Sequence, residues 1–263
     1  MSEARAADPR KSFDRAAETY SEIRPSYPSN MFDDLFRLLP ARPRILEVGP
    51  GTGQATRDLL ARGATVHAIE IGPAMAAKLH DVLPSDALTI TVGDFEHVTI
   101  EHGTFDNVFS ATAYHWISPR AQLDRPAEVL TAGGTIAIVD LNQVASPDDN
   151  GFFAAAQHIY ERYGEVHAGP PLPQRGAVDP PIRSTFSSDP RFAKVEVHSY
   201  DWNQTYSASG YRKLMLSYSV TQMMEPSARE RLLDDMERFV DQHFDGRVTR
   251  PLVVTLTTAT LAI

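Results

Sequence analysis

Ile45-Leu46-Glu47-Val48-Gly49-Pro50-Gly51-Thr52-Gly53 is the stretch that decides the fold of this chain. An apolar run gives way to glycines at every second position, and residues 54–62 then have the composition of a helix. This succession predicts a strand, a tight turn and a helix, which together form the first unit of an open α/β sheet. Ligands of such sheets lie outside the carboxyl ends of the strands, so the turn marks the predicted site.

Composition and charge narrow the possible functions. The chain has 263 residues, which fits one large α/β domain or a domain with an insertion. It has no cysteine, which excludes disulfides, thiolate metal sites and cysteine nucleophiles and is compatible with the cytoplasm. The net charge of −9 argues against a nucleic-acid partner. We find neither a signal peptide in residues 1–11 nor a membrane-spanning stretch, and expect a cytoplasmic monomer or homodimer without a membrane partner.

Strands and helices alternate regularly after the glycine turn. We expect strands at 44–48, 65–70, 88–92, 105–111 and 135–141, with helices at 54–62, 73–82 and 120–130. Such alternation predicts parallel strands joined by right-handed crossovers, with helices on both faces of the sheet. Two more strands are expected at 194–200 and 253–261, and the last of these is predicted to run antiparallel to the others.

Two acidic residues at neighbouring strand ends indicate what the turn binds. Glu70 ends the second strand about twenty residues after the turn, where a carboxylate can accept hydrogen bonds from both ribose hydroxyls. Asp94 ends the third strand and is followed by Phe95. A carboxylate beside an aromatic ring suits an adenine, because the acid accepts from the amino group and the ring stacks. The three features predict an adenosine site; the alternative is that the turn is only a tight connection.

The residues around the turn distinguish between adenosine cofactors. A dinucleotide-binding turn reads G-x-G-x-x-G, whereas Gln54 occupies the third glycine position here. Glu47 precedes the turn; its carboxylate would repel a pyrophosphate and attract the amino group or sulfonium of an amino-acid conjugate. The sequence therefore favours S-adenosylmethionine over NAD. An NAD(P)-dependent oxidoreductase and a non-catalytic S-adenosylmethionine-binding protein on the same fold are the alternatives.

These motifs resemble those of a known enzyme family. Residues 47–53, Glu70 and residues 93–95 are similar in order and spacing to the motifs of class I S-adenosylmethionine-dependent methyltransferases over about residues 44–141. The resemblance implies an α/β, Rossmann-like, seven-stranded, mostly parallel sheet with an antiparallel C-terminal strand and an added helical cap. Residues 13–20, 24–28 and 114–117 are similar to a bacterial small-molecule subgroup that includes trans-aconitate methyltransferase-like proteins.

The resemblance also implies roles for individual residues. Within the turn, those expected to bind the cofactor are Glu47, Gly49, Gly51 and Gly53, which would contact its methionine part. Glu70 is expected at the ribose, and Asp94 and Phe95 at the adenine. Ala111 and Thr112 would lie along the cofactor, and Tyr20 and Arg24 would close over it. The implied reaction is methyl transfer to a small-molecule metabolite by in-line displacement. No spacing of His, Asp and Glu suggests a metal site.

A histidine after the fourth strand is the candidate base. His115 follows that strand on the cofactor edge of the sheet, and an unperturbed histidine titrates near neutrality. Its neighbours Tyr114 and Trp116 are expected to shape the substrate pocket. The alternative is that residues 114–116 simply pack the mouth of the sheet.

The chain divides into four predicted parts. They are an N-terminal helical arm or lid (1–43), a cofactor-binding core (44–141), a substrate-side helical insertion with strand six (142–248) and the final strand of the core sheet (249–263). Within the insertion, many prolines and glycines predict an irregular stretch over 164–190. Ser227 with Glu230 predicts a capping box at the start of an amphipathic helix that ends near Gly246.

Overall fold

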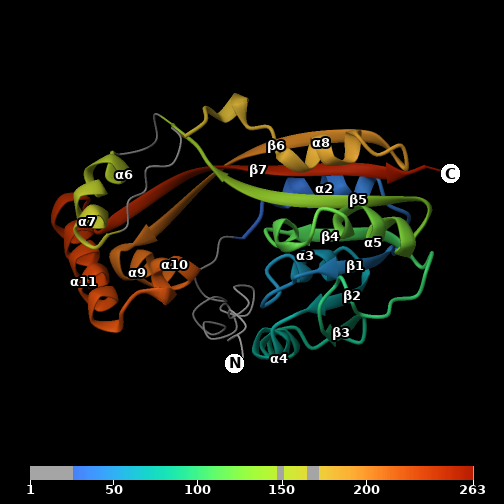
Figure 1. Cartoon of the computed structure of the whole chain (residues 1–263), viewed down its shortest axis with the longest axis horizontal. Helices are drawn as coiled ribbons and strands as arrows, with labels where there is room; N and C mark the ends of the chain where they lie inside the picture. The colour runs from blue at the N-terminus through green and yellow to red at the C-terminus, as the bar shows by residue number, and fades with distance from the viewer. Residues whose placement is uncertain (1–25, 147–150, 165–171, 263) are drawn as a thin grey trace, which may run out of the picture. The chain divides into compact units, whose positions relative to one another are not determined.

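The computed structural model describes residues 26–146, 151–164 and 172–262. Within them, seven strands form one sheet in the order β3-β2-β1-β4-β5-β7-β6 (Figure 1). The strands are β1 (Arg44–Val48), β2 (Thr65–Glu70), β3 (Leu88–Val92), β4 (Phe105–Ala111), β5 (Leu130–Gln143), β6 (Phe192–Ser207) and β7 (Arg247–Leu261). The expected helix at 13–20, and with it Tyr20 and Arg24, lies outside the described residues.

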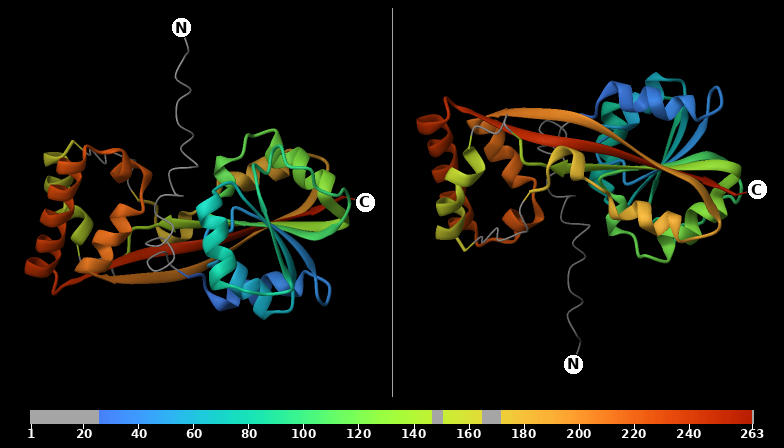
Figure 2. Two further views of the ribbon diagram at one scale, coloured as in Figure 1. Left: turned by 90° about the horizontal axis from the view of Figure 1, so that it is seen from below. Right: turned by 90° about the horizontal axis from the view of Figure 1, so that it is seen from above.

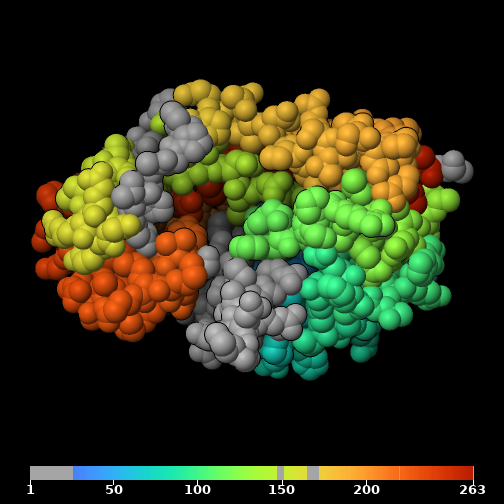
Figure 3. Space-filling view, viewed as in Figure 1, coloured from blue at the N-terminus to red at the C-terminus, as the bar shows by residue number. Residues whose placement is uncertain are grey.

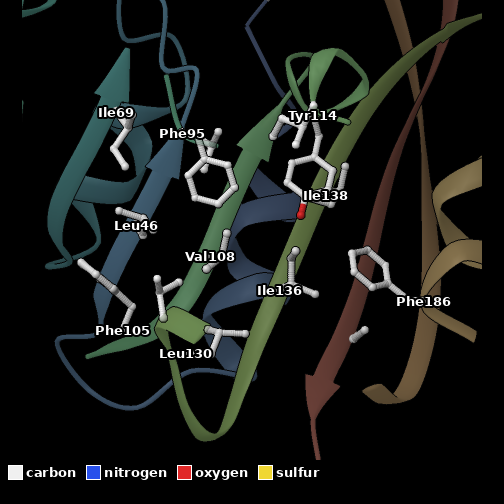
Figure 4. Packing of buried hydrophobic residues seen from close by; sticks show 14 of the residues in the cluster. Leu46, Ile69, Phe95, Phe105, Val108, Tyr114, Leu130, Ile136, Ile138 and Phe186 are labelled. Carbon is white, nitrogen blue, oxygen red and sulfur yellow. The ribbon is translucent and has the colours of Figure 1, made fainter. Parts of the chain in front are cut away.

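The strand order reverses at β1, which lies between β2 and β4. β1 pairs in parallel with β2 on one side and with β4 on the other, and β2–β3 and β4–β5 are also parallel pairs. The chain thus builds outward from β1 in one direction and then in the other, which creates the crevice where open α/β sheets bind ligands. β7 runs opposite to the parallel strands (Figure 4). The predicted mostly parallel sheet with an antiparallel C-terminal strand is confirmed.

Helices cover both faces of the parallel part of the sheet. They are α2 (Ser29–Arg37), α3 (Thr56–Ala61), α4 (Pro73–Val82), α5 (Ala121–Val129) and α8 (Pro181–Ser187). Figure 2 shows α2 and α3 on one face and α5 and α8 on the other. On the first face the ring of Phe32 in α2 packs against that of Phe109 in β4, with centroids 6.2 Å apart. Burial from both sides explains why the strands read as apolar runs.

The other face carries the main hydrophobic core. Val108 of β4 and Ile136 and Ile138 of β5 lie at its centre and are at most 1% exposed (Figure 4). Phe186 of α8 packs against Phe192 of β6, with ring centroids 5.0 Å apart. In the space-filling view, the gold surface of α8 and β6 lies against the green surface of the α5 region (Figure 3). Residues 179–200 therefore complete the core of the sheet.

The described residues form two compact units. One comprises residues 26–142, 179–200 and 254–262, and the other contains the described residues of 143–178 and 201–253. The helices of the second unit are α6 (Phe152–Ala155), α7 (Gln157–Arg162), α9 (Ala208–Leu216), α10 (Ser219–Met223) and α11 (Pro226–His243). Its separate core surrounds Phe152, whose ring makes edge contacts with Tyr211 and Phe244.

Several predicted elements differ from the structure. The stretch 164–190, expected to be irregular, contains α8, which begins with Pro181 at its first position and buries Ile182 and Phe186. The predicted capping box is wrong, because Glu225 caps α11 by accepting a hydrogen bond from the Ala228 amide (2.9 Å). β5, β6 and β7 all extend beyond their predicted bounds. None of the helices in the described part is both long and apolar enough to cross a bilayer.

Gly49 is confined by its neighbours as well as by its backbone. Its φ is +67°, and a Cβ there would lie 2.5 Å from the Ala113 Cβ. Gly103 has a similar φ of +60°, but no atom lies within 4 Å of the Cβ position. We expect Gly103→Ala to cost about 1–2 kcal/mol through strain alone. Gly49→Ala should cost about 1–3 kcal/mol more, because a clash is added.

Urea unfolding of both variants measures this difference. The double variant Gly49→Ala with Ala113→Gly removes the clashing methyl group and should recover most of the extra loss. Equal destabilisation by Gly49→Ala and Gly103→Ala, or no recovery in the double variant, would contradict the account.

Candidate active site

The sheet brings the predicted site residues to one edge. In the parallel register Val48 lies beside Ile69, and Glu70 beside Val92. The glycine turn, Glu70 and residues 93–94 therefore follow neighbouring strand ends at the same edge (Figure 1). Ser110 joins β4 to this group, because its hydroxyl donates to the Val48 carbonyl (2.8 Å). The ends of β1 and β4, where the strand order reverses, are thus fixed together.

The turn after β1 is held tightly. The Gly49 amide donates to the Ile69 carbonyl (2.9 Å), and the Gly53 amide donates to the Pro50 carbonyl (3.0 Å). Gly53 has a φ of +94°, and a Cβ there would lie 2.6 Å from the side chain of Leu79 in α4. The structure therefore leaves no room for a side chain at Gly49, and a side chain at Gly53 would require Leu79 and Leu83 to move.

Glu70 anchors the turn from the next strand. Its Oε2 accepts from the Gly51 amide (3.0 Å) and its Oε1 accepts from the Gly72 amide (2.9 Å). The side chain is 7% exposed. The two backbone bonds fix the orientation of the carboxylate at the end of β2. Sequence reasoning gave Glu70 a role at a ribose and missed that it also shapes the turn.

Glu47 is a buried carboxyl group with an unsatisfied oxygen. It is 1% exposed, and its Oε2 has no hydrogen-bond partner within the described part of the chain. Burial raises the pKa of Glu47 from 4.5 to about 8; the Thr56 hydroxyl acts against this rise and the negative charge of Glu70 adds to it. The group is therefore mostly protonated at neutral pH. A buried polar atom without a partner indicates either strain or a missing ligand.

Asp94 presents a carboxylate at the end of β3, but Phe95 does not accompany it. The Asp94 Oδ1 accepts from the Glu96 amide (3.0 Å), and the side chain is only partly buried. The Phe95 ring is 4% exposed and belongs to the hydrophobic core (Figure 4). The Arg125 guanidinium carbon lies 5.5 Å from the centroid of that ring. The ring therefore packs into the core, which does not favour the predicted stacking of Phe95 on an adenine.

The segment after β4 is strained at Thr112. Ala111 ends the strand, and Thr112 adopts a φ of +55°, which is rare for a β-branched residue. The Thr112 amide donates to the Val139 carbonyl (2.8 Å), and its hydroxyl lies 3.3 Å from that of Tyr27. Strained backbone of this kind persists only where the surroundings impose it, often at functional sites.

The aromatic segment after Thr112 divides into a buried and an exposed part. Residues Tyr114–Trp116 form a short 3-10 helix. Tyr114 is 2% exposed, and its hydroxyl donates to the Gln122 carbonyl (2.7 Å), so its side chain packs in the core, which does not favour the predicted substrate contact (Figure 4). His115 and Trp116 are exposed, with ring centroids 5.0 Å apart. Partial desolvation lowers the pKa of His115, which favours its neutral form at pH 7.

Asp140 is a residue at this edge that sequence reasoning missed. It follows Val139, which pairs with Ala111 at the end of β4. It is partly buried, and desolvation raises its pKa. The available signal was a carboxylate that directly follows the apolar run 136–139. Among the described residues, no three His, Asp or Glu side chains are grouped as a metal ion would require.

The sequence comparisons agree with this geometry. Residues 46–138 match the sequence model of a family described as "Methyltransferase domain". The chain is 27% identical over 256 residues to an uncharacterized methyltransferase of Mycobacterium tuberculosis, covering 95% of this chain and 96% of that protein. It is 30% identical over 181 residues to a malonyl-(acyl-carrier protein) O-methyltransferase of Halorhodospira halophila, covering 65% and 61%.

Solved structures show the same fold. A putative type II methyltransferase from Anaeromyxobacter dehalogenans aligns with a TM-score of 0.60 at 21% identity, covering 91% of this chain and 97% of that one. Phosphoethanolamine N-methyltransferase 2 of Haemonchus contortus, solved with S-adenosylhomocysteine, aligns with a TM-score of 0.55 at 17% identity, covering 97% and 60%. The turn, its carboxylates and these relatives agree: residues 46–138 form a methyltransferase domain, and the chain is an S-adenosylmethionine-dependent methyltransferase.

Proposed function

We propose that this enzyme transfers the methyl group of S-adenosylmethionine to a small-molecule acceptor. The observation that carries the proposal is the buried Glu47 carboxyl, whose Oε2 has no partner in the described structure. An ammonium group is a donor that would satisfy this oxygen, and the methionine part of the cofactor carries one. The residues therefore fit the cofactor on chemical grounds, with Glu47 and the turn glycines Gly49, Gly51 and Gly53 holding its methionine part.

The neighbouring strand ends would hold the nucleoside. The position of Glu70 at the end of β2, where two backbone amides fix its carboxylate, supports its proposed role at the ribose hydroxyls. Asp94, partly exposed at the next strand end, would accept from the adenine amino group. Ala111 and the strained Thr112 would line the cofactor beyond β4. Tyr20 and Arg24 are proposed to close over it and lie outside the described residues.

Bound S-adenosylmethionine supplies a methyl group that its sulfonium already activates. The protein has to align the acceptor and exclude water, and proximity of this kind can contribute roughly 7–11 kcal/mol. His115, which is exposed and held in its neutral form, would accept a proton from acceptors that must lose one, a contribution of about 10²–10⁴-fold. An ionised carboxylate acceptor would need no base.

The charge of the chain supports a small-molecule acceptor over a nucleic acid. The net charge of −9 disfavours a nucleic acid. The Halorhodospira relative is named for transfer to oxygen of a malonyl group carried by an acyl-carrier protein, which supports a small acyl group, free or carrier-bound, as one class of acceptor. The absence of cysteine supports a reducing compartment such as the cytoplasm.

Calorimetry with S-adenosylhomocysteine tests the cofactor residues. We expect wild-type binding in the micromolar range, weakened by about tenfold or more in Glu70→Ala and Asp94→Ala, because each loses a charge-assisted hydrogen bond. Glu70→Ala should have the larger effect, since the turn also loses its anchor. Asp81→Ala, at an exposed position of α4, is the matched control and should bind as wild type. Wild-type binding of NAD(P) instead of S-adenosylhomocysteine would overturn the assignment.

Radiolabel transfer tests the acceptor class. With methyl-labelled S-adenosylmethionine and a bacterial extract separated by size, we expect label in the metabolite fraction. The protein and nucleic-acid fractions should remain at the level of a heat-inactivated control. Label that appears mainly in protein or nucleic acid would contradict a small-molecule acceptor, and binding without transfer to any fraction would favour a non-catalytic role.

A further inference from the structure

The segment that follows β3 is bonded to the side chain of one arginine in α5. The Arg125 Nε donates to the Phe95 carbonyl (3.1 Å), and its Nη2 donates to the Val98 carbonyl (2.7 Å). Its Nη1 donates to the Glu128 carboxylate one turn further along α5 (2.7 Å). Each of the three guanidinium nitrogens therefore has an acceptor, and two of these acceptors belong to residues 93–98, which we call the β3 loop.

Burial strengthens this attachment. The Arg125 side chain is 16% exposed, and its guanidinium lies over the Phe95 ring, which is itself held in the hydrophobic core (Figure 4). Hydrogen bonds from a charged donor are stronger than neutral ones, and a partly desolvated cation is attracted to an aromatic face. The β3 loop is therefore fixed to α5 through its backbone and through one of its side chains.

The same loop positions Asp94. The Asp94 carbonyl accepts from the amides of His97 and Val98, both at 2.9 Å, and its Oδ1 accepts from the Glu96 amide (3.0 Å). Val98 links Asp94 to Arg125 directly, because its amide binds the former and its carbonyl binds the latter. The orientation of the Asp94 carboxylate thus depends on a loop geometry that Arg125 maintains.

A second contact joins the β3 loop to the start of α5. The Glu96 carboxylate accepts from both the amide and the hydroxyl of Ser118. The Ser118 carbonyl in turn accepts from the Gln122 amide in the first turn of α5 (3.0 Å). Because the loop has two attachments to this region, removal of Arg125 alone should loosen the loop without releasing it.

A neighbouring arginine provides a contrast. The Arg120 side chain is 92% exposed, and its Nε donates to the Asp124 carboxylate of the same helix (3.0 Å). An exposed ion pair of this kind contributes little to stability. Arg120 and Arg125 thus carry the same guanidinium at two positions close to each other, and Arg125 is the one that binds the carbonyls of the β3 loop.

We propose that Arg125 is a positioning residue that holds the Asp94 carboxylate where it accepts from the 6-amino group of the adenine, and so sets the preference of the enzyme for adenine. Arg125 would act through Asp94, because its own donors are used on the loop and on Glu128. A carboxylate already held in place loses little further freedom when a ligand binds. This inference rests on the proposed function, in which Asp94 binds the adenine.

Calorimetry with two ligands tests this proposal. One is S-adenosylhomocysteine, and the other is its analogue with hydrogen in place of the 6-amino group. The full-length wild type should bind the analogue about tenfold more weakly, because a hydrogen bond to a charged acceptor is lost. Arg125→Met should weaken S-adenosylhomocysteine binding by about three- to tenfold and leave analogue binding nearly unchanged. The ratio of the two affinities should therefore fall to about threefold or less.

Three further variants show whether the effect passes through Asp94. Arg120→Met is the matched control and should keep the wild-type ratio. Arg125→Lys keeps the charge without the fork of the guanidinium, so its ratio should be intermediate. Asp94→Ala should lose the ratio, and adding Arg125→Met to Asp94→Ala should change it no further. Both ligands are measured on the same protein, so a partly unfolded sample leaves the ratio unaffected.

The outcomes separate this proposal from the assignment of the cofactor. A wild-type ratio in Arg125→Met, or equal weakening of both ligands, would overturn the positioning role and leave the proposed function intact. A wild type that binds S-adenosylhomocysteine with no preference over the analogue would overturn the role of Asp94 and this inference together. Absence of S-adenosylhomocysteine binding in the wild type would instead overturn the proposed function.

Discussion

Glu47 in β1 and Glu70 at the end of β2 are two buried carboxyl groups close to the glycine turn. They differ in their hydrogen-bond partners, and the chemistry of the site depends on this difference. Glu70 is satisfied by the amides of Gly51 and Gly72. Glu47 is enclosed more completely, and its Oε2 has no partner among the described residues. Ionising both in a poorly hydrated space is unfavourable, and burial together with the charge of Glu70 raises the pKa of Glu47 to about 8. The arrangement thus favours a cationic ligand and disfavours a pyrophosphate.

The sheet makes this pairing of carboxyl groups possible. Parallel register places the ends of β1 and β2 side by side, which brings the glycine turn within reach of the Glu70 side chain. The turn backbone then approaches Glu70 through the Gly51 amide, and Gly49 has no room for a side chain beside Ala113. The reversal of strand order at β1 opens the crevice in which these groups lie. Residues 45–53 therefore form both the central strand of the sheet and the turn of the candidate site.

The sequence allowed correct prediction of the features that depend on residues close together in the chain. The alternation of strands and helices predicted the sheet, and the glycine spacing with Glu47, Glu70 and Asp94 predicted the cofactor. It failed where orientation depends on packing across the fold. Phe95 and Tyr114 follow strand ends as a ligand-facing ring would, yet both turn into the core, and nothing in their immediate sequence distinguishes the two outcomes.

Proton release on cofactor binding tests the account most directly. If Glu47 is protonated in the free enzyme, with a pKa of about 8, an ammonium that pairs with it must displace that proton at about pH 7. Calorimetry of S-adenosylhomocysteine binding in buffers of different ionisation enthalpy should show release of close to one proton per molecule bound. This release should disappear as the pH rises above about 8, and it should be absent in Glu47→Gln. Equal proton exchange in the wild type and Glu47→Gln would contradict the central role of this buried carboxyl group.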